Sequence, residues 1–134
     1  MLFSSLKYRM VARREERHYA RQRAEKGFSD YDVFEIGTWF MTQFPRMLED
    51  MRKHQLWIPS VVSAEYVSAH PGADLMNLDG EAQEAILKEW NKILDRTIAC
   101  CDEITSGKLE GNEYMDAVHE VLAMFEKYYG DLGY

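Results

Sequence analysis

The sequence predicts an all-α protein of four to five helices. Apolar residues recur at the spacing of one helix face in three segments, residues 33–51, 80–105 and 113–129. Helix-start residues precede two of these segments, and glycines or prolines fall between them. With 134 residues and 46% hydrophobic content, the chain can bury a core of its own. We therefore expect one helical domain over residues 1–134.

Residues 1–26 are predicted to form a basic N-terminal helix. Good helix formers dominate the segment, and Gly27 is a natural stop. The segment holds eight basic and three acidic residues, a balance of +5, whereas the remaining 108 residues hold eight basic and twenty acidic residues, a balance of −12. Its apolar stripe is too narrow for deep burial. We therefore expect this helix on the surface, swapped into a neighbour, or at an interface.

Residues 29–55 are predicted to form a kinked helix. A capping box and a hydrophobic staple mark its start, made by Ser29 with Asp32 and by Phe28 with Val33. Pro45 interrupts the helical pattern, because proline removes a hydrogen bond and clashes one turn back. The segment is therefore one kinked helix or two short helices that meet near Gln43.

Residues 57–79 are predicted to be an irregular connection that contains, at most, a short strand or a helical turn. Residues 80–129 are predicted to form two helices joined by a short loop, which favours an antiparallel C-terminal hairpin within a bundle. The first of these helices is expected to start at Asp79 or Asn77. Its expected core face is Ala82, Ile86, Trp90, Ile93, Leu94, Thr97, Cys101 and Ile104. The expected core face of the second is Tyr114, Val118, Val121, Leu122, Phe125 and Tyr129.

Composition narrows the classes of function. The net charge of −7 argues against non-specific DNA binding by the whole molecule. No apolar run approaches the ~18 residues of a membrane span, and no signal-peptide pattern opens the chain. The adjacent Cys100 and Cys101 are poorly placed for a disulfide and suit a reducing compartment. We therefore expect a cytoplasmic protein without a membrane partner.

Four arginines repeat every four residues in the N-terminal helix. Steps of four residues drift by ~40°, so the row covers about a third of the helix circumference. The planar guanidinium group suits carboxylate and phosphate, and a tyrosine ring can stack on a base. The alternatives are a solvated face paired with acidic neighbours and a protein-binding patch. The predicted ligand-binding residues are Arg9, Arg13, Arg17, Arg21, Tyr19 and Arg46.

Two carboxylate patterns could mark a metal site, but acidic residues are also common in the first turn of a helix, where they interact favourably with the helix dipole. Glu81-x-x-Glu84 and Glu113-x-x-Asp116, 28 residues apart, resemble the magnesium motif of all-α NTP pyrophosphohydrolases. The resemblance implies four carboxylates around Mg²⁺, but the ends of an antiparallel hairpin would hold these pairs ~30 Å apart. The pairs Glu15-x-x-His18 and Asp116-x-x-His119 resemble half of a di-iron bundle motif. We predict no catalytic residue, no metal and no cofactor.

Three stretches cover about half the chain: the run from Arg21 to Phe34, then Trp39 with Pro45 to Leu48, and the ending from Phe125 to Leu132. They resemble small uncharacterised helical proteins of tailed bacteriophages and prophages. The resemblance implies a phage accessory context inside a bacterial host cell and transfers no catalytic residue.

We therefore expect a non-enzymatic accessory binding protein, assembled as a homo-oligomer. It would capture an anionic, nucleotide-like ligand through the arginine-rich helix and so block host defence signalling. One alternative is a protein-interaction inhibitor or virion assembly factor that uses its acidic body against a host protein. The other is the Mg²⁺-dependent pyrophosphohydrolase. We expect no sequence-specific nucleic acid as partner.

Overall fold

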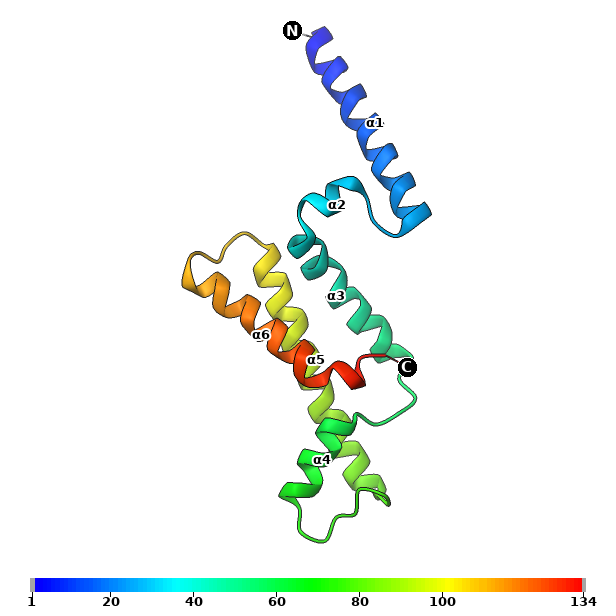
Figure 1. Ribbon diagram of the computed structural model, residues 1–134, viewed down its shortest axis with the longest axis vertical. Helices are drawn as coiled ribbons and strands as arrows, with labels where there is room; N and C mark the ends of the chain where they lie inside the picture. The colour runs from blue at the N-terminus through cyan, green and yellow to red at the C-terminus, as the bar shows by residue number, and fades with distance from the viewer. Residues whose placement is uncertain (1, 134) are drawn as a thin grey trace. The chain divides into compact units, whose positions relative to one another are not determined.

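The computed structural model describes residues 2–133 of the chain, with side chains for residues 5–133. Over this range the protein is built from helices and contains no strand (Figure 1), which confirms the predicted all-α class. The helices form two compact units, Met1–Phe40 and Met41–Tyr134; the single domain over residues 1–134 stays a prediction. The elements are α1 (Leu2–Lys26), α2 (Asp30–Phe34), α3 (Ile36–Lys53), α4 (Ser60–Ala69), α5 (Gly80–Thr105), α6 (Asn112–Tyr128) and the 3₁₀ turn η1 (Tyr129–Asp131).

The chain of the first unit changes direction between α1 and α2. We call this bend and the residues around it, 19–39, the corner. Gly27 has a φ of +84° and donates its N–H to the Arg23 carbonyl at 3.0 Å, which ends α1 as predicted. The capping box is also confirmed. The Ser29 N–H donates to Asp32 Oδ2 at 2.8 Å, and the Asp32 N–H donates to Ser29 Oγ at 3.1 Å. These bonds satisfy two N–H groups at the start of α2.

The helix break in residues 29–55 lies earlier than Pro45 predicts. It falls at Glu35, with φ −135° and ψ 66°, and not near Gln43. Pro45 lies inside α3 and is buried there. The apolar stripe of α3 continues on both sides of the proline, and burial of that stripe outweighs one missing backbone hydrogen bond. The buried residues of this helix are Met41, Phe44, Pro45, Leu48 and Met51.

The core of the second unit is centred on Trp90 of α5. Its indole is fully buried, lies edge-on to the Tyr128 ring with centroids 5.4 Å apart, and donates to Gln55 Oε1 at 2.9 Å. Asp79 caps α5 by accepting from the Ala82 N–H at 2.7 Å, as one of the two predicted starts requires. The predicted core face of α5 is confirmed except at Ile93, which is half-buried, and Cys100 is buried in addition.

The segment 57–79 contains the helix α4, and only its flanks are irregular. α4 has Pro59 at its N-cap position, which offers no side-chain bond. The buried carboxylate of Asp131 replaces that cap. Asp131 Oδ1 accepts from the Ser60 N–H at 2.7 Å and the Ser60 hydroxyl at 2.8 Å, and Oδ2 accepts from the Val61 N–H at 3.1 Å. Since the cap lies about 70 residues further along the chain, no local pattern shows where this helix starts.

The predicted core face of α6 is wrong by about one residue in phase. Val121 is buried, but Tyr114, Leu122 and Tyr129 are exposed. Cys100 Sγ lies 3.3 Å from the Ala117 carbonyl oxygen, so α5 contacts α6 on the face that carries Ala117. Part of the aromatic face is left at the surface. The buried residues of α6 are Ala117, Val121, Met124 and Tyr128.

Substitution of the long-range cap should destabilise the second unit. Asp131→Asn places an N–H₂ group against backbone donors, and we expect a loss of ~1–3 kcal/mol in the free energy of unfolding. Urea denaturation followed by circular dichroism measures this loss. The matched control is Asp116→Asn, an exposed carboxylate on α6. Equal stability of the two variants would contradict the capping role.

The cysteines of α5 should resist alkylation in the folded protein. Burial, with the adjacent Cys100 and Asp102 as lesser causes, raises the pKa of Cys101 to about 12. At pH 8 this leaves a thiolate fraction at least roughly a hundredfold below that of a free cysteine. Iodoacetamide labelling with mass-spectrometric site assignment should therefore be slow at Cys101 in buffer and fast in denaturant. Rapid labelling in buffer would show that the site opens to solvent.

Candidate anion-binding surface

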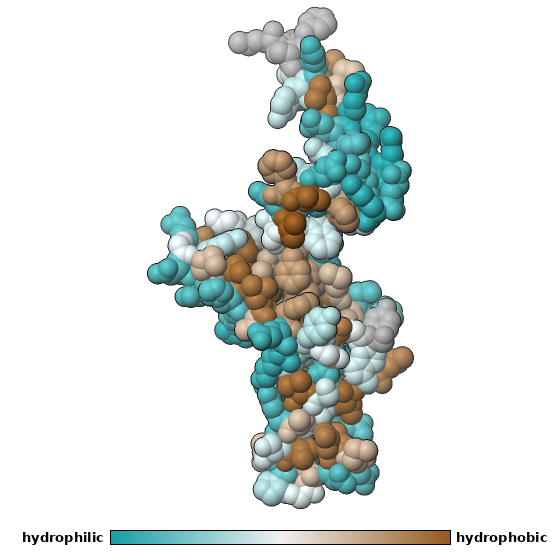
Figure 2. All heavy atoms as spheres, viewed as in Figure 1, coloured by the Kyte–Doolittle hydropathy of each residue, from teal (hydrophilic) through white to brown (hydrophobic). Residues whose placement is uncertain are grey.

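The four arginines of the predicted row are exposed along α1. Within the described residues, none of Arg9, Arg13, Arg17 and Arg21 has a carboxylate oxygen within 4.0 Å. The row makes one side-chain hydrogen bond, from Arg17 Nε to the Arg13 carbonyl at 3.3 Å. Hydrophilic side chains dominate α1 in Figure 2. Three like-charged pairs at i,i+4 together cost about 1 kcal/mol when they stay unneutralised.

The next two cations of the same helix are paired within the chain. Arg23 makes a forked contact with Asp32, Nε to Oδ2 and Nη2 to Oδ1, both at 2.9 Å. Lys26 Nζ lies 3.3 Å from Asp30 Oδ1. Gln22 completes this second pairing, since its amide donates to Asp30 Oδ2 at 2.7 Å and accepts from the Asp30 N–H at 2.9 Å. The carboxylates of α2 are therefore used by the last turns of α1 and not by the row.

The arginine row faces away from α2. Successive residues of an α-helix are ~100° apart around the axis. The α1 side chains that contact α2 are Tyr19, Gln22, Arg23 and Lys26. On a helical wheel their mean direction lies ~150° from the mean direction of the row. The same corner that pairs Arg23 thus directs the row away from the carboxylates of α2.

The pairing at the corner shifts the acidity of both carboxyl groups. The Arg23 guanidinium and the Ser29 N–H hold the pKa of Asp32 well below its usual range. Hydrogen bonds from Gln22 and Lys26 lower the pKa of Asp30. Both groups therefore stay ionised at neutral pH and keep their cations engaged.

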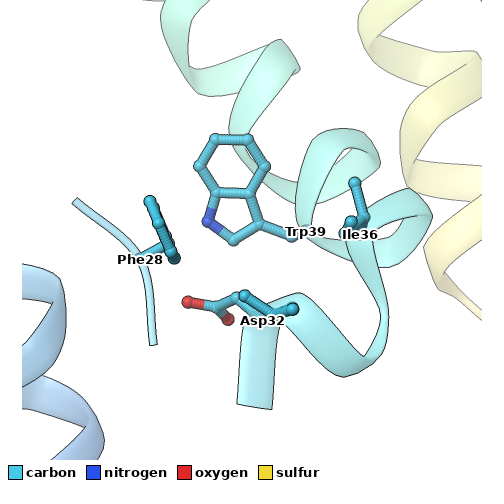
Figure 3. Close-up of a pocket in the computed structure, with 5 residues that line it drawn as sticks. Phe28, Asp32, Ile36 and Trp39 are labelled. Carbon is cyan, nitrogen blue, oxygen red and sulfur yellow. The ribbon is translucent and has the colours of Figure 1, made fainter. Parts of the chain in front are cut away.

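A hollow of about 210 Å³ lies in the first unit, beside the corner. It is lined by four apolar side chains and one carboxylate, Phe28, Val33, Ile36, Trp39 and Asp32. Figure 3 shows the Phe28 ring beside the Trp39 indole, with Asp32 below them. No arginine lines the hollow, so the hollow is separate from the arginine row. The row itself lies on the convex face of a helix.

The other two predicted binding residues differ in their surroundings. Tyr19 is half-buried, and the centroid of its ring lies 5.9 Å from that of the Tyr31 ring. It therefore packs α1 against α2. Arg46 is exposed on the part of α3 that belongs to the second unit, where it lines a hollow with Glu49 and Asp102. The structure thus shows the four arginines on one helix, and a joint site with Arg46 stays a prediction.

The carboxylate patterns do not converge in the described structure. Among residues 2–133, no group of three or more His, Cys, Asp or Glu side chains is placed to hold a metal ion. Glu81 and Glu113 lie in the first turns of α5 and α6, and Glu84 and Asp116 follow three residues further along these helices. These four side chains therefore do not form a common site within the described chain.

No protein-family model matches this chain, and no curated protein or solved structure is significantly similar to it. Among the described helices, none has both the length and the apolar character to cross a bilayer.

Sequence reasoning missed the hollow and the pairing of Gln22 with Asp30. The staple pattern names Phe28 and Val33, but it predicts that they cover each other, whereas both are exposed, at 41% and 53%. Trp39 is one turn beyond Ile36, and that spacing is the signal that places them on one face of α3. No pattern in the sequence indicates the contact of Gln22 with Asp30, because that contact depends on the backbone conformation at Gly27.

Acid should open the corner. The folded pKa of Asp32 is depressed, so its contribution to stability is complete above the unfolded value of about 3.9 and is lost as the pH falls through the lower folded value. We expect the Ser29 and Asp32 amide NMR shifts to change only well below pH 3.9. Arg23→Gln should move that midpoint upward, and Asp32→Asn should remove it. A wild-type midpoint near 3.9 would contradict the pairing.

Proposed function

We propose that this protein is a non-enzymatic binding protein that captures a phosphate-bearing ligand through the arginine row of α1. The observation that carries the proposal is the contrast along one helix. Arg23 and Lys26 are neutralised within the chain, whereas Arg9, Arg13 and Arg17 have no carboxylate within reach in the described structure. A repulsive row that the chain does not neutralise calls for an anion from outside.

The form of the row favours an extended ligand. From Arg9 to Arg21 it spans ~18 Å in steps of ~6 Å. Small ligands usually bind in concave sites that cover most of their surface, and the row is a convex helix face. A chain of phosphates can instead contact successive guanidinium groups along the helix. We therefore place linear polyphosphates ahead of single nucleotides.

Binding should depend on the row and on salt. Calorimetric titration with inorganic polyphosphate, and with mono-, di- and cyclic nucleotides, measures the ligand preference. If four phosphates are neutralised, log K should fall with log salt with a slope of about −3. Arg13→Gln/Arg17→Gln should weaken polyphosphate binding at least roughly tenfold and make the slope shallower by about 1.5.

The matched control removes two positive charges elsewhere. Lys88→Gln/Lys92→Gln changes exposed lysines of α5, and it should leave the salt slope unchanged. No heat with any ligand of the panel, or equal losses in both double variants, would end the proposal. Stronger binding of a cyclic nucleotide or a dinucleotide than of polyphosphate would show that the preferred ligand is compact and not extended.

The biological role follows from the resemblance to tailed-phage and prophage proteins. In that context, capture of a phosphate-bearing signal in the bacterial cytoplasm would deprive host defence of its messenger. We propose this role together with a homo-oligomeric state, which would multiply the number of arginine rows per particle.

The acidic surface of the second unit favours one other function. Residues 41–134 carry eight basic and seventeen acidic residues. Such a surface can press against a basic region of a host protein and block it, as a crude mimic of nucleic acid. A basic partner that binds in low salt even when Arg13 and Arg17 are replaced by glutamine would support this alternative over the arginine row.

We also propose that residues 80–129 form the predicted antiparallel hairpin of a helical bundle. Two contacts between α5 and α6 support it. Arg96 pairs with Glu120, and Cys100 Sγ lies 3.3 Å from the Ala117 carbonyl. From Arg96 to Cys100 the residue number rises along α5, whereas from Glu120 to Ala117 it falls along α6. This is the order expected of an antiparallel pair.

A further inference from the structure

The first unit exposes its apolar side chains and buries almost nothing. Among residues 5–40, the only buried side chain is that of Ser29. Brown, hydrophobic side chains gather around α2 in Figure 2. Helices draw most of their stability from packing an apolar face, and contiguous exposed apolar clusters mark interaction sites. The corner therefore has the composition of an interface.

The corner combines a protruding ring with a receiving hollow. Phe34, the last residue of α2, is 91% exposed. It follows Val33, which lines the hollow, so the two side chains leave the helix in directions ~100° apart. The Phe34 ring therefore does not fill the hollow of its own chain. The hollow holds about 210 Å³, and a cavity of ~150 Å³ accepts benzene, so it has room for a phenyl ring.

The charges of the corner favour an identical partner. Asp30 and Asp32 are neutralised by Lys26 and Arg23 of the same chain. Among residues 28–39, Glu35 is the one carboxylate without a cation within 4.0 Å. The arginine row points ~150° away from this face on the helical wheel. Two copies that meet at the corner thus bring together nearly neutral apolar surfaces and keep their arginine rows apart.

We propose that the corner is a self-association surface in which the Phe34 ring of each copy enters the hollow between Phe28 and Trp39 of the other. The contact is isologous, because ring and hollow belong to the same segment and a two-fold axis exchanges them. An aromatic anchor in an apolar pocket is the usual centre of such an interface. The assembly would carry two arginine rows.

Sedimentation velocity tests the association. The wild-type protein should reach twice the 15.7 kDa of one chain. Because the contact is apolar, the dimer should persist in 1 M salt, where exposed charge pairs are screened. Phe34→Asp should raise the dissociation constant at least about tenfold. Leu56→Asp is the matched control, since Leu56 is 90% exposed in the second unit, and it should change nothing.

Circular dichroism checks that each variant keeps its helices, and Phe34→Ala should give a smaller loss of the same sign. A monomer at all concentrations would overturn the proposal, as would equal dimerisation of wild type and Phe34→Asp. The result is separable from ligand capture, because Phe34→Asp retains all four arginines and should still give heat with polyphosphate.

A photo-crosslink identifies the occupant of the hollow. Phe34→p-benzoylphenylalanine places a reactive ketone on the protruding ring, and an equal mixture of ¹⁴N- and ¹⁵N-labelled chains distinguishes links between copies from links within one. We expect mixed-isotope products that join position 34 to the segment 28–39. Crosslinks confined to single-isotope chains, or mapped to residues 41–134, would show that another surface covers the ring and would refute the two-fold contact.

Discussion

The carboxylate of Asp32 is the group on which the first unit depends. It receives the Ser29 N–H that starts α2, holds Arg23 in a forked contact, and lines the hollow beside Trp39. One ionised side chain thus fixes the turn after α1, the direction of the arginine row relative to α2, and the wall of the apolar hollow. Without it, a basic helix of 25 residues would have few other contacts to orient it within its unit.

The charges of α1 are divided between structure and surface. Its last turns place Gln22, Arg23 and Lys26 where the short α2 can satisfy them, and its middle turns place arginines on the opposite side. This division explains how an acidic protein can keep a positive surface. Asp30 and Asp32, which follow the helix in sequence, pair with Lys26 and Arg23, and they lie on the side of α1 that faces away from the row.

Periodicity and capping patterns predicted the helical class, the end of α1 at Gly27 and the start of α2 at Ser29, because each of these depends on neighbours in sequence. They also predicted which residues form the arginine row. They failed where distant residues decide the outcome. Burial of the stripe around Pro45 keeps α3 continuous, Asp131 caps the start of α4, and contact with α5 decides which face of α6 is buried. The hollow could not be predicted, because no sequence pattern places the Phe28 ring beside Trp39, which lies beyond the break at Glu35.

The cap that Asp131 supplies to α4 links events that are far apart during synthesis. Residues 60 and 61 leave the ribosome about 70 residues before the carboxylate that receives their N–H groups. Closing a loop of that length carries an entropic cost that local contacts cannot offset. Until Asp131 has been synthesised and has left the ribosome, the donors at the first turn of α4 lack this acceptor. We therefore expect α4 to become ordered later than helices whose caps lie close to them in sequence.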